Sequence, residues 1–114
     1  MALHHAASGE LVDLRSLQSG LGATTRTTAL VKSDSFEAIH LVVPGGGQIA
    51  PHQVPGEFTL LCMQGRVTIG LTDGVVELSS GQWVYFDGGV RHSVHAIENS
   101  SLLLTIMLGP ADER

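Results

Sequence analysis

Glycines divide this sequence into short segments that are rich in β-branched and aliphatic residues. The chain of 114 residues contains 14 glycines, and this pattern is typical of short strands joined by tight turns. No segment carries the apolar repeat of a long helix. We therefore expect an all-β domain of about eight to ten antiparallel strands, because a closed barrel or two packed sheets would protect so many strand edges.

The expected strands follow the apolar segments, and Asp73-Gly74 is a strong hairpin signal between two of them. Near the N-terminus Leu11, Leu14 and Leu17 recur at three-residue spacing before Gly20, so one short helical turn competes there with a strand. Strands are predicted at residues 11–14, 27–32, 36–43, 57–63, 67–71, 75–78, 83–86, 93–97 and 102–108.

Composition and charge limit the classes of function. Hydrophobic residues make up 43% of the chain and charged residues 15%, which favours one packed domain with little disorder. The formal net charge is -5, and the few basic residues are scattered along the sequence. Because nucleic acids and anionic membranes are bound by clustered positive charge, neither is expected as a partner.

Cysteine content and apolar runs point to a cytoplasmic protein. Cys62 is the single cysteine of the sequence, which rules out an internal disulfide. No apolar run reaches the roughly 18 residues that a membrane helix needs. The first ten residues have neither a basic region nor a long apolar region, so we expect no signal peptide and a cytoplasmic location.

Two glycine–histidine motifs resemble those of the cupin family. The first runs from Gly46 to Gly65 (GGQIAPHQVPGEFTLLCMQG), and the second from Gly81 to Ala96 (GQWVYFDGGVRHSVHA). They occur in the family's order with one hairpin between them. The resemblance implies a small jelly-roll barrel, also called a double-stranded β-helix, over residues 29–109. Residues 1–28 would then form an N-terminal segment with a short strand or helical turn, and residues 110–114 a C-terminal tail.

The match preserves the glycines better than the metal ligands. The second histidine of the family's His-x-His is Val54 here, and the metal-binding glutamate is Phe58. The proline of the second motif is replaced by Asp87, and its last asparagine by Ala96. The family positions that are kept are Gly46, His52, Gly65, Gly81, Gly89 and His92.

The resemblance therefore implies a degenerate metal motif. A catalytic divalent metal normally needs about three protein ligands and an open position, and only His52 and His92 remain of the family's four. We expect no cofactor. If iron, manganese, nickel or zinc is bound, His52 and His92 would hold it.

Two other side chains are candidates for the missing ligand. Glu57 neighbours the lost glutamate position, but strand alternation turns it away from Phe58 unless the Pro55-Gly56 turn introduces a bulge. His40 could supply a third ligand if the register of the strand at 36–43 points it inward. Cys62 shares the parity of Phe58, so it is expected inside the barrel as a small buried hydrophobe.

The expected function is the binding of a small, largely apolar or aromatic molecule in the barrel. Small-molecule sites combine apolar walls with a few polar groups. The expected pocket residues are His52, Val54, Phe58, Leu60, Cys62, Trp83 and His92. The alternative is an enzyme, either a metal-dependent dioxygenase or isomerase with non-standard ligands, or a metal-free enzyme that uses a histidine as general base. A homodimer is expected from the apolar composition and the resemblance.

Overall fold

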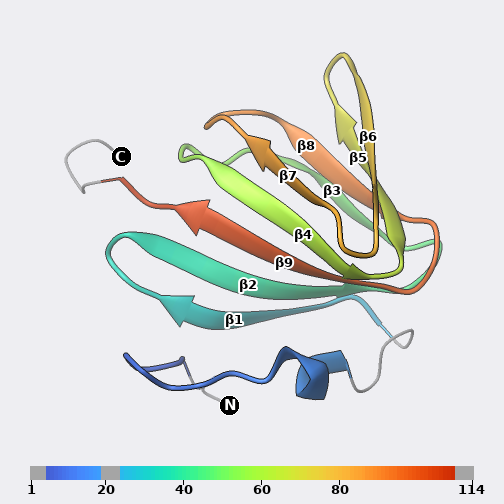
Figure 1. Cartoon of the computed structure of the whole chain (residues 1–114). Helices are drawn as coiled ribbons and strands as arrows, with labels where there is room; N and C mark the ends of the chain where they lie inside the picture. The colour runs from blue at the N-terminus through green and yellow to red at the C-terminus, as the bar shows by residue number, and fades with distance from the viewer. Residues whose placement is uncertain (1–4, 19–23, 110–114) are drawn as a thin grey trace.

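The fold is a sandwich of two antiparallel sheets (Figure 1). The computed structural model describes residues 5–18 and 24–109. One sheet has five strands in the order β1-β2-β9-β4-β7, and the other has four in the order β3-β8-β5-β6. The strands are β1 Arg26–Lys32, β2 Phe36–Val43, β3 Gln48–His52, β4 Phe58–Gln64, β5 Arg66–Leu71, β6 Gly74–Ser79, β7 Trp83–Phe86, β8 His92–Ala96 and β9 Ser100–Met107.

The core lies between the two sheets and draws side chains from both. Along β4, Phe58, Leu60 and Cys62 are buried, whereas the residues between them are half-buried on the other face. This alternation is what a strand with one core-facing side requires. The buried apolar cluster consists of Leu41, Val43, Phe58, Leu60, Cys62, Val67, Ile69, Leu78, Phe86, Val94, Ala96, Leu102, Leu104 and Ile106. The predicted all-β class is confirmed.

The N-terminal segment is not a strand at 11–14. Residues 11–13 have no regular structure, and Leu14–Gln18 form the 3₁₀ helix η1. The Asp13 carboxylate accepts hydrogen bonds from the backbone and the side chain of Arg15 at the start of this turn. The alternative of one short helical turn therefore describes this segment. Its expected end at Gly20 lies outside the described residues.

Strand β3 was not predicted. Its sequence, QIAPH, contains Pro51 and follows three glycines, which are signals of a turn. Proline is tolerated at a sheet edge and at irregularities because it has no N–H to donate. Both conditions hold here, since β3 is an edge strand and its pairing with β8 shifts register between Ile49 and His52.

Glycine is required where β4 passes into β5, which belongs to the other sheet. Gly65 lies between Gln64 and Arg66 and has a φ of 90°. A Cβ at this position would collide with the carbonyl oxygen of Asn99 and with Ser100 Oγ. The sharp crossing between the sheets therefore depends on the missing side chain.

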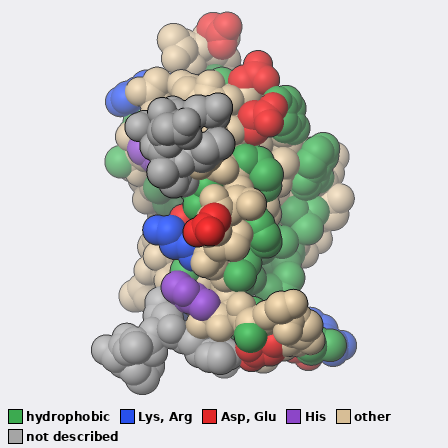
Figure 2. All heavy atoms as spheres, turned by 90° about the vertical axis from the view of Figure 1, so that its left-hand side faces the viewer, with side chains coloured by type: hydrophobic (Ala, Val, Ile, Leu, Met, Phe, Trp, Pro, Cys, Tyr) green, Lys and Arg blue, Asp and Glu red, His purple; other side chains and the backbone are tan. Residues whose placement is uncertain are grey.

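Several large apolar side chains remain on the surface. Trp83, Tyr85 and Met107 are exposed on β7 and β9. Figure 2 looks at the end of the sandwich that lies on the left in Figure 1, and hydrophobic side chains gather on its right-hand side. Within the described residues, no helix is both long and apolar enough to cross a membrane.

Candidate functional site

A largely apolar cavity of about 450 Å³ lies between the two sheets. Its volume falls in the range of roughly 300–1,000 Å³ that is usual for small-molecule sites. The polar members of its lining are Thr27, Glu37, His52 and His92. The rest of the described lining is apolar and comprises Ala29, Ile39, Leu41, Ile49, Val54, Leu60, Val94, Leu104 and Ile106.

His52 and His92 lie side by side on the four-stranded sheet. They are direct partners in the register of β3 with β8, and their ring centroids are 4.2 Å apart. His52 Nδ1 lies 3.2 Å from the carbonyl oxygen of Ala50, and His92 Nδ1 lies 3.0 Å from that of Val90. Because a carbonyl only accepts, we assign the ring proton of each neutral imidazole to Nδ1. Each Nε2 is then an acceptor without a proton.

His92 is the better buried of the two histidines, with a side chain that is 2% exposed. Desolvation by this burial lowers the pKa of His92, and the hydrogen bond to Val90 opposes the effect. The ring is therefore neutral at pH 7. Its centroid lies 4.4 Å from that of Phe58, so an aromatic side chain packs against it where the family motif would place a carboxylate.

Glu37 is a cavity residue that the sequence analysis missed. It shares the inward face of β2 with Ile39 and Leu41, which also line the cavity. Alternation along the predicted strand at 36–43 groups these three residues together. Alternation alone does not show which face of the strand points inward, because the pairing of β2 with β1 and β9 determines that orientation.

Four of the seven predicted pocket residues line the cavity, namely His52, Val54, Leu60 and His92. Phe58 and Cys62 point into the core but lie outside the described lining. Phe58 stacks on Phe86 at a centroid distance of 5.1 Å. Burial raises the pKa of the Cys62 thiol, which suits a packed, unreactive side chain.

Trp83 lies outside the described lining of this cavity. It lies at the start of β7, where Val84 and Phe86 pack into the core. Alternation therefore turns Trp83 to the outer face, and its side chain is 60% exposed.

The two additional metal-ligand candidates do not reach the histidine pair. His40 is buried on β2, but it faces away from the cavity-lining Ile39 and Leu41, and its Nε2 lies 2.8 Å from Ser101 Oγ. Desolvation by burial and the charge of Arg26 lower the pKa of His40. Glu57 is exposed and accepts a hydrogen bond from the Tyr85 hydroxyl.

The residues present do not fit a catalytic metal. Two imidazoles fall short of the roughly three protein ligands that such a site uses. Among residues 5–18 and 24–109, no group of three or more His, Cys, Asp or Glu side chains is placed to hold an ion. The arrangement offers hydrogen-bond acceptors within an apolar cavity.

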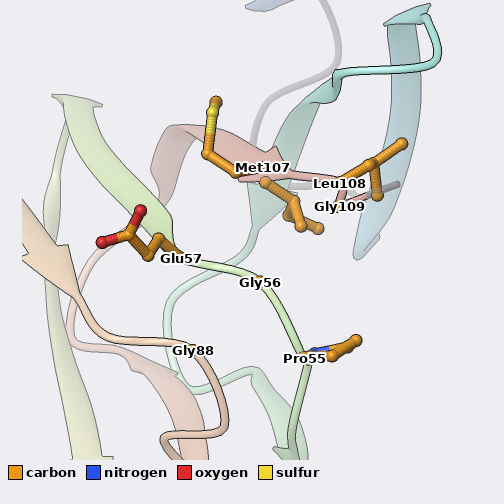
Figure 3. Close-up of a pocket in the computed structure, with 8 residues that line it drawn as sticks. Pro55, Gly56, Glu57, Gly88, Met107, Leu108 and Gly109 are labelled. Atoms are coloured by element: carbon orange, nitrogen blue, oxygen red, sulfur yellow. The ribbon is translucent and has the colours of Figure 1, made fainter. Parts of the chain in front are cut away.

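A second hollow of about 340 Å³ lies where β4 begins and β9 ends (Figure 3). Glu57 is one of its lining residues, and the Glu57 carboxylate points away from Met107 and Leu108. Gly56 allows a close backbone approach here, since a Cβ on it would collide with the carbonyl oxygen of Met107. The described lining is Pro55, Gly56, Glu57, Gly88, Ile106, Met107, Leu108 and Gly109.

Comparisons with known proteins agree on the fold. The model of the family described as "Cupin domain" matches residues 39–108. A cupin superfamily protein from Desulfitobacterium hafniense is similar with a TM-score of 0.80 and 16% identity, over 96% of this chain and 100% of the other. A conserved protein of unknown function from Streptococcus pyogenes is similar with a TM-score of 0.78 and 18% identity, over 97% of this chain and 98% of the other.

A third similar structure is an RmlC-like cupin family protein with a double-stranded β-helix fold from Methanocaldococcus jannaschii. It gives a TM-score of 0.72 and 22% identity, over 79% of this chain and 85% of the other. No curated protein sequence matches the chain. These likenesses establish the fold, and identities this low carry no activity with them.

Proposed function

Since this chain belongs to the cupin domain family, we propose that it binds a small, largely apolar or aromatic molecule in the cavity between its sheets. The observation that carries the proposal is the lining itself, in which two histidine acceptors, one carboxylate and one threonine interrupt apolar walls. Apolar walls supply affinity through burial, and a few fixed polar groups orient the ligand. His52 and His92 would orient it through their Nε2 atoms.

Filling the cavity should weaken binding. We expect Ile39→Trp to weaken binding of phenylethanol, a small neutral probe, by about tenfold or more, which corresponds to about 1.4 kcal/mol. Ile39 is half-buried and lines the cavity, so a larger side chain would occupy the ligand's space. Isothermal titration calorimetry measures the affinity, and circular dichroism checks that the variant is folded.

The matched control is Ile97→Trp. Ile97 is exposed and lies outside the described cavity lining, so the same exchange of side chains should leave the affinity unchanged. An unchanged affinity in the folded Ile39→Trp variant would argue against this cavity as the binding site. The same holds if the parent protein does not bind the probe.

The proposed binding does not use a metal. Protein purified without affinity metals should contain well below one equivalent of iron, manganese, nickel or zinc, because His52 and His92 provide only two of the donors that such an ion needs. Mass spectrometry of the digested protein measures the metal content. A stoichiometric metal that both His52→Ala and His92→Ala remove would contradict this and favour a metal-dependent enzyme.

A further inference from the structure

We infer that the occupant of the cavity is an apolar amine, whose positive charge is recognised by the carboxylate of Glu37. This inference rests on the proposed function and narrows the class of ligand. It follows from the position of Glu37, from the charges around the cavity and from the hydrogen-bonding state of the two histidines.

Glu37 is a half-buried carboxylate that lines the cavity and has no ion-pair partner among the described residues. It lies on β2 opposite Ile106 of β9 and Lys32 of β1. Within the part of the chain that the structure describes, its side chain makes no hydrogen bond and no ion pair, although the exposed Lys32 is its direct partner on β1. A carboxylate beside apolar walls lacks part of its hydration, so a cationic ligand would stabilise it.

The described cavity lining includes no Lys or Arg. A carboxylate or phosphate ligand would therefore bring its negative charge close to Glu37, and the lining itself offers no cation to compensate it. Like charges in a partly desolvated site repel each other, and such repulsion excludes the wrong class of ligand. The charge arrangement disfavours acids and favours bases.

The histidine pair adds acceptors on the opposite sheet. Both Nδ1 protons are used by the carbonyl groups of Ala50 and Val90, so each neutral ring offers only Nε2 as an acceptor. An ammonium group has three N–H donors, and a hydroxyl group has one. The polar groups of the cavity thus match a ligand that donates hydrogen bonds, while the apolar walls match its hydrocarbon part.

Three probes that share one phenylethyl group test the inference. Phenylethylamine is a cation, phenylethanol is neutral and phenylpropanoate is an anion at pH 7.5. We expect the amine to bind about tenfold or more tightly than the alcohol, as for a hydrogen bond to a charged group. The carboxylate should bind most weakly. Calorimetric titration of the full chain gives the three affinities.

Glu37→Gln isolates the contribution of the charge. This variant keeps the size of the side chain and should bind the amine about tenfold more weakly, with less than about a twofold change for the alcohol. The control is Glu98→Gln, which removes the same charge from a side chain that is 59% exposed and outside the described lining. It should change none of the three affinities.

The outcomes separate this inference from the proposed function. If neither the amine nor the alcohol binds, or if Ile39→Trp does not weaken the binding, both the proposed function and the inference fail. If the alcohol binds in the cavity but the amine has no advantage, only the inference is overturned. It is also overturned if Glu37→Gln leaves the preference for the amine intact, or weakens the amine and the alcohol equally.

Discussion

Replacing Phe58 with alanine is expected to lower the free energy of unfolding by about 3–5 kcal/mol, the usual cost of truncating a buried phenylalanine. The ring is 1% exposed and lies between Phe86 and His92, with centroid distances of 5.1 and 4.4 Å. Truncation would leave a void in a core where both stacking partners are held by their strands. The loss combines the lost burial of the ring with the cost of the void.

Urea denaturation followed by circular dichroism measures this loss. Phe58→Leu keeps most of the apolar volume and should cost less than the alanine variant. Val75→Ala is a surface control, because Val75 is 70% exposed, and its effect should stay within about 0.5 kcal/mol. Equal stabilities of the Phe58→Ala and Val75→Ala proteins would show that the ring is not the centre of the core.

Replacing Gly65 with alanine should destabilise the fold by about 2–5 kcal/mol, because backbone strain and overpacking act together. With a φ of 90°, the backbone of Gly65 is in a region that alanine adopts at a cost. The added Cβ would also collide with the Asn99 carbonyl oxygen and Ser100 Oγ, and it would lie 2.8 Å from Ser100 Cα. Two of these three atoms belong to the backbone, so a change of rotamer cannot remove the overlap.

Gly81→Ala separates the two effects. Gly81 has nearly the same backbone angle, with a φ of 87°, but no atom lies within 4 Å of a Cβ placed on it. Only the backbone strain should therefore remain in Gly81→Ala, and it should lower the free energy of unfolding by about 1 kcal/mol. Thermal and urea unfolding of both variants test this difference. If both alanine variants lose the same stability, the crossing at Gly65 is not tightly packed.

Most of the fold could be predicted from local sequence. The apolar segments between glycines and the Asp73-Gly74 turn located most strands after the N-terminal segment, because β-branched and aliphatic residues favour strands. Strand β3 could not be predicted in this way. Its ladder to β8 tolerates Pro51 because β3 lies at the edge of its sheet and its register shifts there. Both features depend on tertiary pairing and cannot be read from the local sequence.

The candidate site was only partly predictable. His52 and His92 follow from the motif resemblance, and the register of β3 with β8 makes them neighbours. To predict Glu37 as a cavity residue, one would need to know which face of β2 points inward. That face is set by the pairing of β2 with β9, which is distant in sequence. Trp83 was misplaced because an aromatic residue in an apolar segment resembles core, while β7 turns Val84 and Phe86 inward instead.

Ile106 is a shared wall between the interior cavity and the hollow of Figure 3. This single side chain, on the middle strand of the five-stranded sheet, contributes to both spaces. A substitution at this position would therefore change the shape of both spaces at once.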